Sequence, residues 1–212
     1  MNVAITLNDV VRAFSHNFAG AYQKNISLHE NLEFASYEHV EGDVWVEEAH
    51  ISSGSNHIVC EKIDPFRLSK TYSFNSEEDY CDLLYSQFSF EFFGVCELTY
   101  PKAMSDLNLL YQEIAKQHKC TLLSQEINNS KPATLHFLSY NKCLANNIKF
   151  LENFSKAWQS FDVIVTANPY ILKKKNLNNR KKISIKIETE QNKGIPADYS
   201  FASLKEVYNF YQ

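Results

Sequence analysis

The chain has 212 residues, of which 44% are hydrophobic, so it is long enough for one sizeable core and too apolar for a disordered protein. No apolar run reaches the roughly 18–20 residues of a membrane span, and the N-terminus lacks the pattern of a secretion signal. The five cysteines form no CxxC pair, which argues against a zinc knuckle and predicts free thiols in a reducing compartment. We therefore expect synthesis in a cytoplasm and no membrane partner.

The charge is distributed unevenly along the chain. Residues 1–130 contain 8 Lys and Arg against 19 Asp and Glu, a net charge of −11, whereas residues 131–212 contain 13 against 6, a net charge of +7. One interpretation is a solvated surface without a partner. The other is head-to-tail packing, in which the acidic part of one copy meets the basic part of the next, and contacts of that kind close into rings.

The first part of the chain predicts a strand followed by helices. Residues 3–7 form an apolar strand, and residues 9–24 have helical spacing of their apolar positions. Residues 76–94 predict a helix capped by Ser76, and residues 101–119 predict a clearer helix entered by Pro101.

After Cys120 short apolar strands alternate with helices. Strands are predicted at 121–126, 133–139, 161–166 and 183–187, and helices at 143–150 and from about Ser203. This alternation is typical of an α/β protein with a parallel sheet. Ligands of such sheets bind beyond the carboxyl ends of the strands, so the candidate site residues are those at the strand ends: Thr6, Asn8, Ser139, Thr166, Glu188 and Glu190. The other interpretation is that these small polar residues satisfy local backbone groups, with Asn8 as a helix cap.

Five segments carry a resemblance to a known family. "VAITLNDVVRAF" has Thr6 and Asn8 where the family has an Asp-x-Asp motif, and "LHFLS" ends in Ser139 as a second motif would. The basic stretch after "VTANP" supplies Lys173 as a third-motif lysine, "ISIKIETE" occupies the place of the fourth, and "IPADYSFASLKEVYNF" matches the usual C-terminus. In this order the segments resemble the haloacid dehalogenase-like (HAD-like) superfamily.

The resemblance implies a Rossmann-like parallel sheet core made of residues 1–24 and 121–212. It further implies that the acidic, aromatic-rich residues 25–120 form a large α+β insertion of the cap type after the first strand and helix.

The family's chemistry depends on carboxylates that this chain lacks at two positions. In the family the first Asp attacks phosphorus, the second exchanges a proton, and magnesium binds near both. The Thr6 hydroxyl is protonated at neutral pH, and Asn8 has no carboxyl group to titrate. We therefore expect no enzyme activity, no metal and no cofactor, with a vestigial pocket formed by Thr6, Asn8, Ser139, Lys173 and Glu188.

A second resemblance concerns the role of the protein. "FEFFGVCELTYPKAMSDLNLLYQEI" and "FDVIVTANPYIL" are similar to a gene family of crAss-like phages. That similarity implies a non-catalytic ring or collar component near the portal and tail of a virion. Its expected partners are further copies of itself and portal, neck or tail proteins, and its expected location is the virion, with the host cytoplasm during assembly.

Two alternatives stay open. The chain is an active magnesium-dependent phosphatase or 5'-nucleotidase if Thr6 is the nucleophile, or if water attacks while Glu188 holds the metal. A basic loop offers contacts to a protein partner, a phosphate or a nucleic-acid backbone, although no Gly-rich cradle accompanies it and no specific nucleic-acid ligand is expected. Its residues are Lys173, Lys174, Lys175, Arg180, Lys181 and Lys182.

Overall fold

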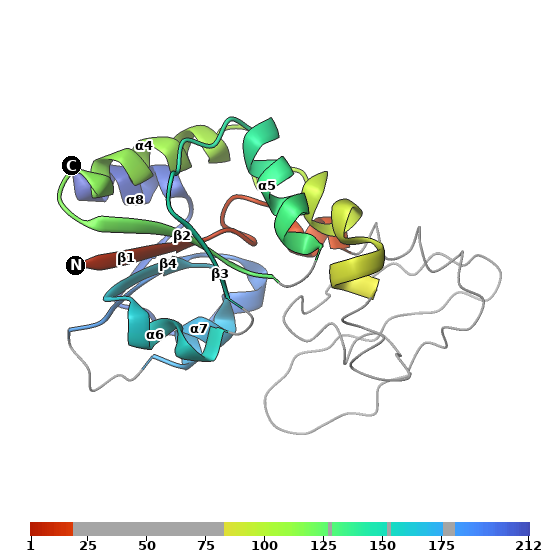
Figure 1. Cartoon of the computed structure of the whole chain (residues 1–212). Helices are drawn as coiled ribbons and strands as arrows, with labels where there is room; N and C mark the ends of the chain where they lie inside the picture. The colour runs from red at the N-terminus through yellow and green to blue at the C-terminus, as the bar shows by residue number, and fades with distance from the viewer. Residues whose placement is uncertain (19–82, 127–128, 152–153, 176–180) are drawn as a thin grey trace, which may run out of the picture.

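A sheet of six parallel strands forms the centre of the computed structural model, which describes residues 1–18, 83–126, 129–151, 154–175 and 181–212 (Figure 1). The strands are β1 (Asn2–Thr6), β2 (Lys119–Gln125), β3 (Ile148–Leu151), β4 (Val163–Thr166), β5 (Ile183–Ile187) and β6 (Tyr199–Phe201). β1, β2 and β4 are almost continuous runs of buried residues, because both faces of a parallel sheet are covered. The strands predicted at 3–7, 121–126, 161–166 and 183–187 are confirmed.

β1 lies inside the sheet, in the strand order β3-β2-β1-β4-β5-β6. The chain runs outward from β1 to β2 and β3, and then returns to place β4 on the other side of β1. Val3 is accordingly paired with Cys120 of β2 and with Val163 of β4. The connections after β1 and β4 diverge, so the carboxyl ends of these strands form the switch point at which α/β sheets bind ligands. The predicted Rossmann-like α/β fold is confirmed.

Helices cover both faces of the sheet. α4 (Ala103–Ala115) and α8 (Leu204–Tyr211) pack against each other on one face, whereas α6 (Ala157–Ser160) and α7 (Pro169–Lys173) lie on the other (Figure 1). Successive residues of β1 point to opposite faces, so Ile5 joins the larger hydrophobic cluster and Ala4 joins the smaller one. Ser203 accepts a hydrogen bond from the backbone N–H of Glu206 at the start of α8, where the sequence predicted the last helix.

α4 belongs to the core, although it lies inside the predicted insertion of residues 25–120. Its buried residues Leu107, Leu110 and Ile114 join the cluster that also contains Val207 of α8. The core therefore includes this helix together with the residues after 120. The other bounds of the insertion stay a prediction, because residues 19–82 lie outside the described part.

The predicted strand at 133–139 is wrong. Residues 130–140 form the helix α5 (Ser130–Tyr140), and Ser139 is consequently not at a strand end. Four buried residues of this segment follow the pattern i, i+1, i+4 and i+5, which places them on one face of a helix. They are Ala133, Thr134, Phe137 and Leu138. The β-branched and aromatic residues of this segment gave a misleading strand signal, since burial on one helix face overrides local propensity.

The predicted helix at 143–150 is also wrong. The chain after Cys143 is irregular until the edge strand β3, which pairs with β2 so that Leu122 lies opposite Ile148. None of the residues of β3 is fully buried, so the segment lacks the apolar run from which inner strands are recognised.

The helix predicted at 9–24 begins later than expected. Residues 9–11 form a turn in which the backbone N–H groups of Val10 and Val11 donate to the carbonyl of Leu7, and Asp9 has a φ of 59°. Helical residues are 14–18, and the rest of the prediction lies outside the described residues.

Residues 83–94 consist of two short helical segments, η1 (Leu83–Gln87) and η2 (Phe90–Gly94), where one helix was predicted. Two short 3-10 segments, η3 (Phe154–Lys156) and η4 (Glu190–Asn192), complete the described elements. The proposed cap Ser76 lies outside the described residues. Within the described ranges no helix has the length and apolar character required to cross a membrane.

Candidate functional site

Two threonines meet at the switch point of the sheet. Thr6 ends β1 and Thr166 ends the neighbouring β4, and the Thr6 hydroxyl donates to Oγ1 of Thr166 at 3.0 Å. Oγ1 of Thr166 also accepts from the backbone N–H of Asn168 at 3.0 Å, and both threonines are buried. The sequence placed both residues at strand ends, and the strand order brings their hydroxyls together.

Asn8 is held by a buried arginine that was not among the predicted site residues. The Oδ1 atom of Asn8 accepts from Nε of Arg12 at 2.9 Å and from Nη2 at 2.6 Å. The backbone of these two residues also forms an isolated bridge. Asn8 therefore orients the guanidinium group and does not cap the first helix.

The Arg12 guanidinium lies against the end of β2. Its Nη2 atom is 2.7 Å from Oε1 of Glu126, and neither side chain is exposed. The hydroxyls of Ser124 and Thr134 donate to the same carboxylate oxygen at 2.6 and 2.5 Å. The other oxygen, Oε2, is buried and has no hydrogen-bond partner among the described residues. The residues at the end of the strand next to β1 are thus Ser124 and Glu126, not the predicted Ser139.

Aromatic rings and a carbonyl surround the same guanidinium. Its Cζ atom lies 4.9 Å from the ring centre of Phe93, 5.6 Å from that of Phe137 and 6.0 Å from that of Phe14. Nη1 donates to the carbonyl oxygen of Phe93 at 3.0 Å. Stacking on aromatic faces and fixed hydrogen bonds leave this arginine no freedom to reach a ligand.

Asp9 is the carboxylate that follows β1 most closely. Its Oδ1 accepts from the backbone N–H of Ser15 at 2.9 Å and its Oδ2 accepts from the Ser15 hydroxyl at 2.5 Å. Burial raises the pKa of Asp9 above its usual value, while the bonds from Ser15 and the charge of Arg12 act in the opposite direction. Asp9 was not among the predicted site residues, and its left-handed backbone, with a φ of 59°, carried no clear sequence signal.

The predicted site residues Ser139, Lys173 and Glu188 are not part of this arrangement. Ser139 is exposed on α5, and Lys173 is exposed at the end of α7. Glu188 follows β5 as predicted, but it is exposed and lies 3.7 Å from Nζ of Lys186. Because β4 separates β5 from β1, Glu188 lies two strand spacings, about 10 Å, from the end of β1.

The predicted basic loop is divided among several environments. Lys175 is buried and pairs with Asp198, and Lys182 pairs with Asp162 at 3.1 Å. Nζ of Lys174 lies 5.3 Å from the ring centre of Tyr170. The remaining members are Lys173 and Lys181, which are exposed, and Arg180, which lies outside the described residues.

The donor groups at this edge do not fit a magnesium ion. Magnesium prefers carboxylate oxygens and water. Here Oδ1 of Asn8 and Oε1 of Glu126 are bound to a guanidinium, and both oxygens of Asp9 are bound to Ser15. Among these groups in the described ranges, that leaves one carboxylate oxygen, Oε2 of Glu126, too few for a magnesium ion. Within the described ranges no group of three His, Cys, Asp or Glu side chains is arranged to hold a metal.

Comparisons with known proteins give structural similarity alone. No family model matches the chain, and no curated protein matches its sequence. The chain is similar to a dehalogenase whose crystal structure contains an intermediate complex, with 10% identity, 99% of this chain and 96% of the other covered, and a TM-score of 0.49. It is also similar to a protein described as a haloacid dehalogenase-like hydrolase from Burkholderia xenovorans LB400, with 11% identity, coverages of 98% and 94%, and a TM-score of 0.48.

These comparisons correct one expectation. The expectation of a protein that is not an enzyme is contradicted, because the two structural neighbours named above carry the names of a dehalogenase and a hydrolase. Identities of 10 and 11% transfer no residue roles to this chain. The described core is an α/β domain with a Rossmann-like parallel sheet.

Proposed function

We propose that the chain is a hydrolase of the HAD-like type that releases phosphate from a small phosphate monoester at the carboxyl ends of β1 and β4. The observation that carries this proposal is the buried hydroxyl pair of Thr6 and Thr166 at the switch point of the sheet. Parallel α/β sheets place their ligands at this position, and a hydroxyl is the nucleophilic group that β1 offers there.

In this proposal Thr6 is the nucleophile. Its oxygen bonds to phosphorus while its proton passes to Asp9, the ester bond breaks, and the leaving alcohol takes up that proton from Asp9. Water then breaks the bond between Thr6 and phosphorus, which releases phosphate and restores the hydroxyl. The hydrogen bond to Thr166 orients the hydroxyl of Thr6 from the neighbouring strand.

Asp9 supplies the proton exchange in the proposed reaction. It follows the same strand as Thr6, and burial raises its pKa. A carboxyl group whose pKa is closer to the working pH both donates and accepts a proton more effectively. The donor groups at this edge do not support the alternative in which Glu188 holds a magnesium ion. The proposed reaction therefore uses no metal.

Paired variants of Thr6 test the proposal. Thr6→Ser keeps the hydroxyl group, whereas Thr6→Val keeps the shape and removes it. Release of phosphate from p-nitrophenyl phosphate and from nucleoside monophosphates is expected in the Ser variant and lost in the Val variant. Activity that depends on added magnesium and disappears in Glu188→Ala would instead support the metal-dependent alternative.

We also propose that copies of the chain assemble head to tail, as a ring or collar protein of a phage virion would. The uneven charge, −11 for residues 1–130 and +7 for residues 131–212, supports this assembly. The assembly is independent of the proposed hydrolysis. Native mass spectrometry at low salt should show a closed oligomer that dissociates as salt rises, and purified virions should contain the protein. A monomer at every salt concentration, absent from virions, contradicts it.

A further inference from the structure

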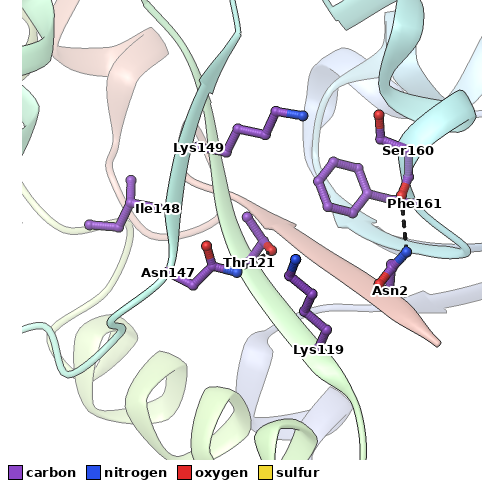
Figure 2. A pocket seen from close by; sticks show the side chains of 8 residues that line it. All are labelled: Asn2, Lys119, Thr121, Asn147, Ile148, Lys149, Ser160 and Phe161. Atoms are coloured by element: carbon purple, nitrogen blue, oxygen red, sulfur yellow. Dashed lines mark hydrogen bonds between the residues drawn. The ribbon is translucent and has the colours of Figure 1, made fainter.

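A polar cavity lies at the edge of the sheet opposite the Thr6 site, where β1 and β2 begin. Its volume is about 250 Å³, and its walls come from the starts of β1 and β2, from the residues around the start of β3 and from the segment before β4 (Figure 2). Asn2, at the start of β1, is four residues before Thr6, so the two edges are about 13 Å apart along the strand. This cavity is therefore separate from the proposed hydrolase site.

Two ammonium groups line the cavity. Lys119 begins β2 and Lys149 lies in β3, and Figure 2 shows both side chains beside the same space. Nζ of Lys149 lies 5.9 Å from the ring centre of Phe161, and Lys119 has no carboxylate within ion-pair distance in the described part of the chain.

Asp162, next to the cavity residue Phe161, has partners of its own. Asp162 follows Phe161, and its Oδ2 accepts from the backbone N–H of Asn2 at 2.8 Å while its Oδ1 pairs with Lys182 at 3.1 Å. A third lysine thus compensates the carboxylate. The cavity keeps a net positive charge from Lys119 and Lys149.

The hydroxyl group of Thr121 adds a hydrogen-bond donor to the lining of the cavity. The Nδ2 group of Asn147 donates to the hydroxyl oxygen of Thr121 at 2.7 Å and to the carbonyl of Cys120 at 2.9 Å. Thr121 accepts this bond, so its own hydrogen is directed to another acceptor. The network also fixes the orientation of Asn147. Two ammonium groups and an oriented hydroxyl suit an anion with several acceptor oxygens.

From these features we infer that the amino edge of the sheet is a binding site for the phosphate group of a small molecule. A volume of about 250 Å³ is below the range of typical drug-sized pockets, so it suits a phosphate group better than a whole cofactor. The ring of Phe161 adds an apolar wall for the carbon atoms next to the phosphate.

Titration of the ¹⁵N-labelled full chain with inorganic phosphate at low salt tests the inference. We expect saturable shifts of the amides of Lys119, Thr121 and Lys149. Lys119→Ala and Lys149→Ala should each weaken phosphate binding about threefold or more. The matched control is Lys193→Ala, which removes an exposed lysine on the turn after η4.

Equal weakening by Lys193→Ala, or shifts that grow without saturation at all lysines, would overturn the inference, because nonspecific charge attraction then explains the binding. Retained affinity in the Lys119→Ala/Lys149→Ala double variant would overturn it as well. Intact near-UV circular dichroism of each variant shows that folding is not the cause of a loss. The result does not depend on whether the chain hydrolyses phosphate esters at the other edge.

Discussion

The guanidinium of Arg12 and the carboxylate of Glu126 form an ion pair with 2.7 Å between Nη2 and Oε1, and neither side chain is exposed. The two residues are 114 positions apart in the chain. Their ion pair connects the turn after β1 to the end of β2. Ser124 and Thr134 donate further hydrogen bonds to the carboxylate, and Asn8 accepts from the guanidinium. This network fixes the shape of the carboxyl edge beside the proposed nucleophile Thr6.

Removal of one partner should therefore be strongly destabilising. Arg12→Met leaves the buried carboxylate of Glu126 without its counter-charge, and we expect a loss of about 3–5 kcal/mol in the free energy of unfolding, measured by urea denaturation. The Arg12→Met/Glu126→Leu double variant removes both charges and should lose less than Arg12→Met alone. A loss below 1 kcal/mol in Arg12→Met, on the order of an exposed ion pair, would show that the pair is not buried in solution.

The raised pKa of Asp9 should make stability depend on pH. A carboxyl group whose pKa is higher in the folded state binds more protons when folded, so stability falls as the pH rises from the ordinary value of 3.8 through the raised pKa. Asp9→Asn removes this dependence, and its unfolding free energy should decline less over that window. Parallel pH profiles for the two proteins would contradict the raised pKa.

Two buried thiols should resist alkylation in the folded protein. Burial raises the pKa of Cys96 to about 11 and that of Cys120 to about 12, so few thiolates exist at pH 8. Peptide mapping after iodoacetamide treatment should find both residues unmodified until urea is added. Rapid modification of either residue without urea would show that its side chain is accessible.

Magnesium should not stabilise the carboxyl edge. A ligand that binds only the folded state raises the melting temperature. Oδ1 of Asn8 and Oε1 of Glu126 are already bound to Arg12, and a single remaining carboxylate oxygen of Glu126 is a poor site for magnesium. We expect the same melting temperature with excess magnesium and with EDTA. A magnesium-dependent increase that vanishes in Glu188→Ala would place a metal near that residue and contradict this account.

The inner strands could be predicted from the sequence because continuous apolar runs such as Val163–Thr166 are typical of buried parallel strands. The edge strand β3 was missed because its four residues are only partly buried or exposed. The helix α5 was predicted as a strand, although the spacing of Ala133, Thr134, Phe137 and Leu138 fits one helix face.

The site was predicted in part. Thr6 and Thr166 follow from their positions at strand ends, once the sheet is recognised as parallel. Ser124 also lies near the end of a correctly predicted strand, but the false strand at 133–139 directed the prediction to Ser139. The pair of Arg12 and Glu126 depends on a contact across more than a hundred residues, and no local pattern encodes such a contact.

The measurement that tests the central claim most directly is phosphate release by the purified chain and its two Thr6 variants, all assayed in EDTA. The account predicts release by the natural chain and by Thr6→Ser, and a loss of more than about a hundredfold in Thr6→Val at unchanged stability. No release by the natural chain with any phosphate monoester, or equal release by the folded Thr6→Val variant, would contradict it.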